Sequence, residues 1–254
     1  PSAHFQVETY TGAGANTSVT FSGNSDLKPD FLWLKNRTAG YAHAAFDSNR
    51  NLGSAVNAPF LEPNDTSTEN SNQNWWNSTN NGINTDGFQF GSVSEHNLNN
   101  LNSEYVAWAW KANGGTTSSN TDGTVTTTTQ VNSDAGFSIV TWAGGGTGTL
   151  GHGLGETPGM WIIKNRDYAV SWSVGFSNIP DVMTRSNYLQ LNAAAPKSTY
   201  NNLWGTSDSQ INSTTIGAAG DRSVNISGND YVGYFFKGKQ GFSKPSLRYL
   251  FGGF

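Results

Sequence analysis

One block of nine residues occurs twice in the chain, and this repeat constrains the fold more than any other feature of the sequence. Residues 29–37 are Pro-Asp-Phe-Leu-Trp-Leu-Lys-Asn-Arg, and residues 158–166 are Pro-Gly-Met-Trp-Ile-Ile-Lys-Asn-Arg. Two further blocks recur in the same order: residues 5–10 match 137–142, and residues 105–111 match 231–237. Three matches in register predict duplicated modules whose connecting loops have gained and lost residues, because an internal repeat marks a repeated structural unit.

The repeated blocks have the composition of β-strands. They are rich in β-branched and aromatic residues, and they run for about five to eight residues between Gly, Asn, Asp or Pro, which is typical of all-β proteins. Residues 105–110 alternate large and small side chains (Tyr-Val-Ala-Trp-Ala-Trp), as a strand with two different faces does. The sequence therefore predicts an all-β fold of two tandem, duplicated β-sandwich modules, jelly-roll-like, with little or no helix.

The positions of the repeats set the expected domain boundaries. Module 1 is expected over residues 1–112 and module 2 over residues 136–240. Residues 113–135 form a connector rich in Gly, Ser and Thr, in which residues 123–131 are β-branched enough to form a strand on one module or on a neighbouring chain. Residues 241–254 begin as module 2 does, so we expect a strand-like tail, an incomplete third repeat. Such a strand should dock, for instance by exchange with a neighbouring subunit, because an unpaired edge promotes aggregation.

The composition excludes several classes of protein. The net charge is −4 and the sequence pI is about 5.5, so the chain lacks the basic footprint of a nucleic-acid-binding protein. It has no cysteine, which excludes disulfides, zinc–thiolate sites and iron–sulfur clusters. Its longest apolar runs, residues 105–110 and 231–236, are far below the roughly 20 residues of a membrane-spanning helix. We expect no nucleic acid partner and no membrane insertion.

No arrangement of residues in the sequence indicates catalysis. The chain has no Gly-x-Ser-x-Gly elbow, and its four histidines are far apart, without metal-binding spacing: His4, His43, His96 and His152. His152 lies in a Gly-rich turn, where a hydrogen bond to nearby backbone is favoured over catalysis, and His43 is expected to pack or to lie on the surface. The sequence thus predicts no catalytic residue and no cofactor.

Two other polar features of the sequence could form a metal or ligand site. Asp86 and Asp122 lie in Asn/Asp turns that could bind calcium, but neither belongs to an Asp-x-Asp-x-Asp-Gly loop, so no metal site is predicted. The Lys-Asn-Arg triplet recurs at residues 35–37 and 164–166. Because it occurs in both modules, a structural role at the end of a strand is favoured over a ligand site.

Trp75 and Trp76 are the one local feature that suggests a binding site. They lie within an Asn/Ser/Thr-rich segment beside the amides of Gln73, Asn74 and Asn77. Exposed rings flanked by amides would stack on sugars, which makes the pair a candidate glycan contact. The alternative, which is favoured, is that both rings tuck beneath the loop and pin it to the sandwich, since burying large aromatic rings is strongly stabilising.

The repeats resemble a known family. The turn His-Gly-Leu-Gly at residues 152–155, the block at 158–166 and Tyr-Val-Ala-Trp-Ala-Trp-Lys at 105–111 are similar to the repeat module of phage virion proteins, especially tail-fibre-like proteins of marine and cyanobacterial phages. The similarity covers nearly the whole chain, twice over. Module 1 lacks the His-Gly-Leu-Gly turn, and module 2 has Thr-Thr-Ile-Gly at residues 214–217 where module 1 has Gly-Phe-Gln-Phe-Gly-Ser. The family supplies no catalytic residue to transfer.

This resemblance implies a non-enzymatic structural protein of the virion surface, assembled in the host cytoplasm, where proteins rarely form disulfides. A component of a tail fibre or another appendage is expected, adhesive to a host-surface glycan in one version. Its partners would be other virion proteins and further copies of itself, with a homotrimer favoured by analogy. The first alternative is a capsid decoration or cement protein, and the second is a carbohydrate-binding module.

Overall fold

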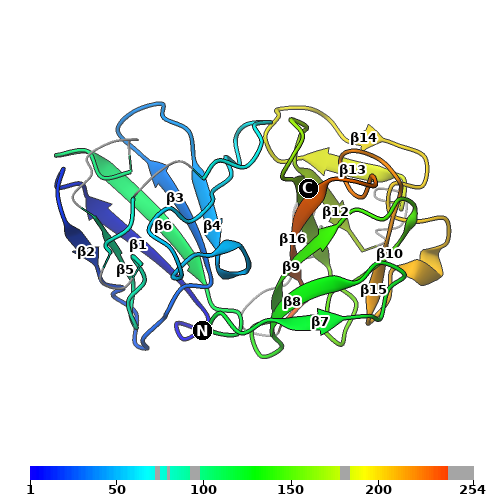
Figure 1. Ribbon diagram of the computed structural model, residues 1–254, viewed down its shortest axis with the longest axis horizontal. Helices are drawn as coiled ribbons and strands as arrows, with labels where there is room; N and C mark the ends of the chain where they lie inside the picture. The colour runs from blue at the N-terminus through cyan, green and yellow to red at the C-terminus, as the bar shows by residue number, and fades with distance from the viewer. Residues whose placement is uncertain (72–74, 79–80, 92–97, 178–183, 240–254) are drawn as a thin grey trace, which may run out of the picture. The chain divides into compact units, whose positions relative to one another are not determined.

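A computed structural model describes residues 1–71, 75–78, 81–91, 98–177 and 184–239. The chain forms two compact units, Pro1–Thr116 (unit 1) and Thr117–Phe254 (unit 2), each shown in Figure 1. The described residues contain β-strands and only two single-turn 3-10 helices, η1 (Ser48–Arg50) and η2 (Asp208–Gln210). The predicted all-β fold is confirmed.

Unit 1 is built from a four-stranded and a two-stranded antiparallel sheet. The larger sheet has the order β1-β6-β3-β4, and the smaller one pairs β2 with β5. Their bounds are β1 Phe5–Thr11, β2 Thr17–Val19, β3 Phe31–Asn36, β4 Ala44–Asp47, β5 Phe88–Phe90 and β6 Glu104–Trp110.

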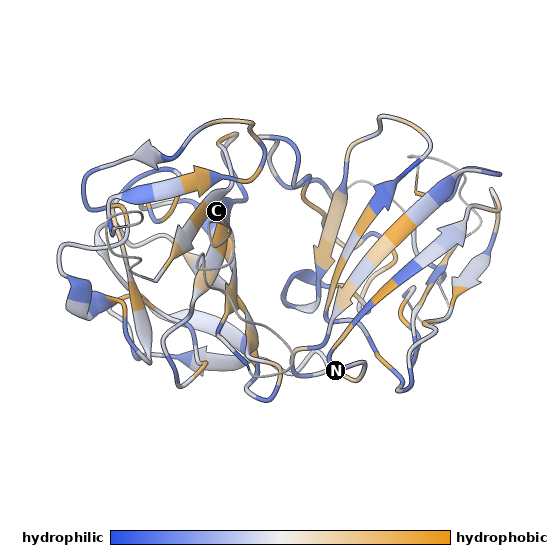
Figure 2. Ribbon diagram, turned by 180° about the vertical axis from the view of Figure 1, so that it is seen from behind, coloured by the Kyte–Doolittle hydropathy of each residue, from blue (hydrophilic) through white to orange (hydrophobic). Residues whose placement is uncertain are grey.

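The core of unit 1 lies between these two sheets. On β6 the buried side chains are those of Tyr105, Ala107 and Ala109, whereas the large residues between them are only partly buried. The strand therefore has two different faces, as the alternation in the sequence predicts, with Tyr105, Ala107 and Ala109 on the buried face and Val106, Trp108 and Trp110 on the other. In Figure 2 the ribbons of this sheet alternate between apolar and polar colours along their length, as expected of strands with one face in the core. Apolar residues of both sheets, Phe88 and Phe90 of β5 among them, belong to one buried cluster.

Unit 2 has an eight-stranded and a two-stranded sheet. The larger has the order β14-β13-β12-β11-β16-β9-β8-β7, and the smaller pairs β10 with β15. Their bounds are β7 Ser118–Asn120, β8 Thr127–Asn132, β9 Phe137–Ala143, β10 Gly148–Gly151, β11 Met160–Asn165, β12 Ser173–Phe176, β13 Asn187–Gln190, β14 Ser198–Thr199, β15 Thr215–Ala218 and β16 Asp230–Phe236.

The two units share one strand order. The order β1-β6-β3-β4 of unit 1 has the same arrangement as β9-β16-β11-β12 of unit 2, and the pair β2-β5 has the same arrangement as β10-β15. The registers correspond as well, because Lys35 lies opposite Val106 in unit 1 and Lys164 lies opposite Val232 in unit 2. The repeated blocks of the sequence thus occupy equivalent strands. Descent of both units from one duplicated ancestor stays a prediction.

The connector predicted at residues 113–135 falls mostly within unit 2. Its strand β8 pairs with β9, and β7 pairs with β8 at the edge of the large sheet. The tail at residues 241–254 lies outside the described residues.

Candidate functional site

Trp75 and Trp76, the candidate glycan contacts, are buried in the core of unit 1. They are 4% and 3% exposed. The Trp76 ring stacks on Phe90, with centroids 5.5 Å apart, and Trp75 packs on Phe60, with centroids 4.5 Å apart. Phe46 contacts both tryptophans edge-on. This corrects the hypothesis of two exposed, sugar-stacking rings, because aromatic neighbours already cover their faces. Of their flanking amides, Gln73 and Asn74 lie outside the described residues.

Unit 2 has an equivalent residue pair, held by an equivalent backbone hydrogen bond. The amide of Gly91 donates to the Trp75 carbonyl (2.8 Å), as the amide of Ala219 donates to the Leu203 carbonyl (2.9 Å). Leu203-Trp204 is therefore the counterpart of Trp75-Trp76, and Trp204 is fully buried. The sequence carried this signal, since the two pairs are separated by nearly the same number of residues as the repeated blocks.

The recurring Lys-Asn-Arg triplet forms a structural lock in each unit. In unit 1 the Asn36 carboxamide oxygen accepts from the amides of Thr38 (2.8 Å) and Ala39 (2.9 Å), which closes the turn after β3. Its nitrogen donates to the Tyr105 hydroxyl of β6 (3.2 Å). That hydroxyl also accepts from the amide of Asn100 (2.8 Å). One buried asparagine thus ties a turn to the neighbouring strand.

In unit 2 the lock is the same. The Asn165 oxygen accepts from the amides of Asp167 and Tyr168 (both 2.9 Å), and its nitrogen donates to the Tyr231 hydroxyl (3.1 Å). The Tyr231 hydroxyl accepts from the amide of Ile226 (2.9 Å). Burial is the main cause that raises the pKa of Tyr231 to about 12, so the hydroxyl keeps its proton. The structural role favoured for this triplet accords with these contacts.

The two histidines singled out in the sequence pack within their own units. His152 is fully buried, its Nδ1 accepts from the amide of Leu154 (3.2 Å), and its Nε2 lies 3.2 Å from the Asn212 carbonyl. Burial lowers its pKa from 6.5 to about 4. His43 accepts a hydrogen bond from the Trp33 indole at Nδ1 (2.9 Å).

The two turn aspartates that were candidate calcium ligands, Asp86 and Asp122, accept hydrogen bonds within their own units. Asp86 accepts from the amide of Leu27 (3.1 Å), and Asp122 accepts from the Asn120 side chain (2.9 Å). Across the described ranges, no three His, Asp or Glu side chains are grouped as a metal ion would require. The same ranges include no helix with the length and apolarity to traverse a bilayer.

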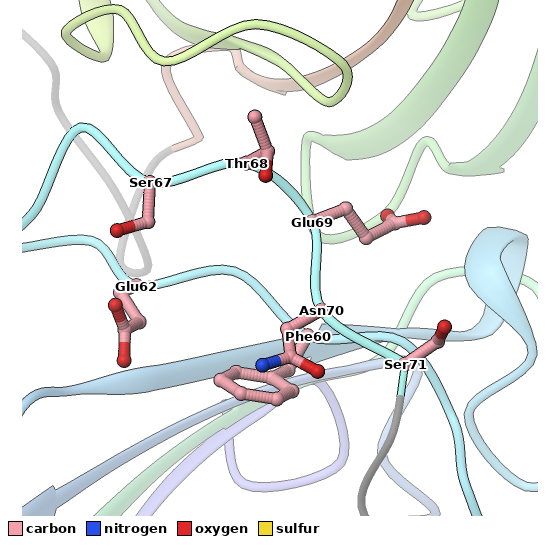
Figure 3. Close-up of a pocket in the computed structure, with 7 residues that line it drawn as sticks. All are labelled: Phe60, Glu62, Ser67, Thr68, Glu69, Asn70 and Ser71. Carbon is pink, nitrogen blue, oxygen red and sulfur yellow. The ribbon is translucent and has the colours of Figure 1, made fainter.

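The structure forms a cavity that no motif in the sequence indicates. It measures about 380 Å³ and lies in unit 1, between two antiparallel segments joined by the Phe60–Asn70 bridge. Figure 3 shows these two segments. The lining is polar apart from one ring and comprises Phe60, Glu62, Ser67, Thr68, Glu69, Asn70 and Ser71. Cavities of this size accommodate small ligands.

The two carboxylates of the cavity have different electrostatic environments. Glu69 accepts a charge-assisted bond from Arg50 (2.8 Å), a guanidinium that also binds the buried Asp47 (2.7 Å). Partial burial raises the pKa of Glu62, and the charge of Asp65 raises it further, against a hydrogen bond from Ser67 that lowers it. In Figure 3 the Glu62 and Glu69 side chains extend in different directions. The two carboxylates of a glycoside hydrolase flank the bond that they cleave. Glu62 and Glu69 do not flank one point in this way.

The segments that line the cavity have counterparts in unit 2 with different side chains. The bridges Ala45–Leu61 and Phe60–Asn70 correspond to the pairs Val174–Leu189 and Tyr188–Ser198, so the cavity segments match β13 and β14. Glu62 and Glu69 then match Gln190 and Lys197. Both acidic side chains of unit 1 are therefore replaced at this position in unit 2, one by an amide and one by a cation.

Comparison with known proteins gives one match. The sequence model of a family described as a domain of unknown function (DUF7483) matches residues 1–249. No curated protein and no solved structure matches the chain.

Proposed function

We propose that this chain, which belongs to the DUF7483 family, is a non-enzymatic structural protein of a phage particle. Its place would be the virion surface, in a tail fibre or another appendage, after assembly in the host cytoplasm. The proposal rests on one observation: both units contain the same hydrogen-bonded framework. It includes the Asn36–Tyr105 bond in unit 1 and the Asn165–Tyr231 bond in unit 2. Buried polar side chains are used here to fix turns and strands, which suits a rigid building block. The resemblance of its repeats to phage virion modules supplies the assignment to a particle.

Two measurements test this proposal. Antibodies against the chain should label intact particles at tail appendages in electron micrographs, and native mass spectrometry should find a homo-oligomer, a trimer by analogy. Labelling over the capsid shell would favour the capsid decoration alternative. A strict monomer at micromolar concentration, together with unlabelled particles, would contradict every virion assignment.

The cavity supports a second candidate function, carbohydrate binding by unit 1. The hydroxyl, amide and carboxylate groups that line the cavity suit a polyhydroxylated ligand. The one ring of the lining, Phe60, is 6% exposed and packs on Trp75, so it forms part of the wall and offers no open face for stacking. The pair Trp75-Trp76 would then act beneath the site and not in contact with the sugar. Within a virion this site would serve adhesion to a host-surface glycan.

A glycan array tests the second candidate with a matched pair of variants. Thr68→Arg places a long side chain on an exposed lining position, and Thr66→Arg places the same side chain nearby at a position that does not line the cavity. Binding to a glycan that Thr68→Arg abolishes and Thr66→Arg preserves would support the cavity as the site. Equal loss in both variants, or no binding to any glycan by the unmodified chain, would contradict it.

A further inference from the structure

The large sheet of unit 1 carries two tryptophans on its outer face, the face that points away from the core. Trp108 of β6 lies opposite Trp33 of β3, and both side chains are half-buried, between the fully buried residues of the inner face. Their ring centroids are 5.9 Å apart and their planes are inclined by 64°. A ligand ring that stacks on one of these indoles would therefore contact the other indole as well.

A lysine lies beside the two indoles. Lys35 follows Trp33 by two residues on β3, so both side chains project from the same face of the sheet. The Lys35 ammonium donates to the carbonyl oxygens of Tyr41 (2.8 Å) and Ala39 (3.4 Å) in the turn that follows the strand. An ammonium has three hydrogens, so one remains for a ligand, and its positive charge is only half-buried.

His43, which directly precedes β4, adds a hydrogen-bond donor. Its Nδ1 accepts from the Trp33 indole N–H (2.9 Å), and an indole nitrogen can only donate, so Nδ1 carries no proton. Burial, and then the charge of Lys35, lower the pKa of His43, which keeps the ring neutral near pH 7. The single proton of the neutral ring is then on Nε2. Among the described residues, neither His43 Nε2 nor Trp108 Nε1 has a hydrogen-bond partner.

The polar groups that remain available around the two indoles are thus all donors, and one of them is a cation. The two rows of residues that cross the outer face through Trp108 and Lys35 contain no carboxylate. In the flanking rows, Asp47 is bound to a buried guanidinium and Glu104 accepts from a threonine hydroxyl. This part of the face therefore favours an anionic group that accepts hydrogen bonds. We call four residues together the outer-face site: Trp33, Lys35, His43 and Trp108.

Unit 2 fills the same positions with buried side chains. By strand register, the counterparts of Trp108, Lys35 and His43 are Tyr234, Lys164 and Trp172. All three are at most 1% exposed, and the Trp172 ring stacks on Tyr234 with centroids 6.5 Å apart. The half-buried indoles with available donors are therefore a property of unit 1.

We propose that the outer-face site binds a saccharide that bears a carboxylate, such as a uronic acid residue of a polysaccharide. The apolar C–H face of the sugar ring packs on an indole, whose face is electron-rich. The carboxylate pairs with the Lys35 ammonium, and the sugar oxygens accept from His43 Nε2 and Trp108 Nε1. An acidic peptide fits less well, because it would bring backbone N–H donors to four side chains that offer no free acceptor.

This site is distinct from the cavity of unit 1. None of its four residues lines the cavity, and the cavity has carboxylates where the outer-face site has a cation. The inference therefore depends neither on a ligand in the cavity nor on the proposed place of the chain in a virion.

The test titrates the full chain, by calorimetry, with oligomers of galacturonate and of glucuronate. Each is paired with the neutral oligomer of galactose or glucose, and a glutamate-rich peptide serves as the acidic control. We expect saturable binding of at least one uronate, at least about tenfold tighter than its neutral counterpart and weaker at high salt. No binding of either uronate at millimolar concentration, equal affinity for the neutral oligomers, or tighter binding of the peptide would overturn the proposal.

Two variants assign the binding to the outer-face site. Trp33→Ile introduces the residue that unit 2 has at this position, Ile162, and should weaken uronate binding about tenfold or more while the folded spectrum is retained. Lys35→Gln removes the charge and should abolish the preference for the uronate over the neutral oligomer. It also provides the test should Trp33→Ile fail to fold.

Two control variants change other aromatic or ligand positions. Tyr200→Ala removes an exposed ring of unit 2, and Thr68→Trp fills part of the cavity without adding charge. Both should bind the uronate as the unmodified chain does. Binding that Thr68→Trp abolishes and the outer-face variants preserve would overturn the proposal in favour of the cavity. Self-association of the chain that Trp33→Ile abolishes would overturn it in favour of a second copy as the occupant.

Discussion

Units 1 and 2 differ at the edges of their sheets and agree in the strands that cross the core and in the turns that follow β3 and β11. Tyr105 stacks on Tyr10 with centroids 4.9 Å apart, and its counterpart Tyr231 stacks on Trp142 at 5.4 Å. Each tyrosine hydroxyl also binds the asparagine that ends the adjacent strand. A chain can change an aromatic residue here, but the lock of hydroxyl, carboxamide and turn amides recurs unchanged. Buried polar groups tolerate little variation because each must keep its partner.

The differences lie at the edges of the sheets. In unit 2 strand β8 pairs with the outer edge of β9, whereas no described strand pairs with the corresponding edge of β1 in unit 1. At the opposite end of the sheet, the cavity segments of unit 1 carry Glu62 and Glu69 where unit 2 has Gln190 and Lys197. The contrast teaches that the shared framework provides stability, whereas recognition would be specific to each unit. Four predictions test this division.

The largest expected effect comes from the tryptophans at the centre of each core. Trp76→Ala and Trp204→Ala should each destabilise the variant's own unit by about 3–5 kcal/mol, because each leaves a large cavity. Trp204 also loses the bond from its indole to the Asn187 carbonyl (2.8 Å). Hydrogen exchange resolved by peptide should show lost protection in β5 and β6 for the first variant and in β15 and β16 for the second. Unchanged protection in Trp76→Ala would contradict its place in the core and restore the exposed-ring hypothesis.

These tryptophans also show what the sequence could and could not establish. Strand character and the matching blocks were sufficient to predict the all-β fold and the equivalence of the two nine-residue blocks. Trp75-Trp76 was assigned to a loop because its surroundings are polar, although aligning it with Leu203-Trp204 would have pointed to the core. Burial of both rings is nevertheless the alternative that the sequence favoured over sugar stacking, because a long loop can bury aromatic rings while its polar neighbours stay in water.

The cavity and the unequal sheet edges of the two units could not be predicted for a different reason. Glu62 and Glu69 form no motif, and they line one cavity only because the Phe60–Asn70 bridge folds their segment back on itself. In the same way, the sequence of β1 does not reveal that, among the described residues, no strand pairs with its outer edge, whereas β8 pairs with its counterpart β9. Both features depend on which segments pair in three dimensions, and spacing along the chain does not record this.

Acid should destabilise unit 2 more than unit 1, because unit 2 has His152 at the position where unit 1 has Phe21. Phe21 follows Val19 as His152 follows Leu150, and both are buried. The pKa of His152 is lowered from 6.5 to about 4, so the folded state binds fewer protons than the unfolded state between these values. Stability of unit 2 is then full above about pH 6.5 and falls as the pH drops to about 4, by up to about 3 kcal/mol.

Denaturant unfolding at pH values between about 6.5 and about 4, monitored in each unit by hydrogen exchange, measures this loss of stability. The reciprocal variant Phe21→His should transfer acid sensitivity to unit 1, and His152→Phe should remove it from unit 2 at a constant cost from its two lost hydrogen bonds. Equal acid sensitivity of both units in the unmodified chain would show that His152 does not control the difference.

Removing the asparagine locks should have a smaller effect. Asn36→Ala and Asn165→Ala each remove two acceptor bonds to a turn and one donor bond to a tyrosine, and each should cost about 1–3 kcal/mol. The cost should be larger in unit 2, where the Asn165 nitrogen also donates to the Arg222 carbonyl (2.8 Å). Tyr105→Phe and Tyr231→Phe leave the asparagine oxygens bound to the turn and remove the hydroxyl that accepts from the asparagine nitrogen, so they separate the turn from the tyrosine contact. A negligible loss in either unit would mean that the recurrence of this triplet is not structural.

The smallest effect concerns two exposed tyrosines that follow the locks. The Arg222 guanidinium lies over the Tyr168 ring, 4.4 Å from its centroid, and donates to its hydroxyl (3.0 Å). An exposed cation–π contact is worth about 0.5–1 kcal/mol, so Tyr168→Ala should destabilise unit 2 by that amount. In unit 1, Lys35 binds the carbonyl oxygen of Tyr41 (2.8 Å), a backbone contact that Tyr41→Ala retains. Tyr41→Ala should therefore cost less, and thermal unfolding of the two variants side by side measures the difference. An equal loss would indicate that the two surfaces, like the two cores, are built alike.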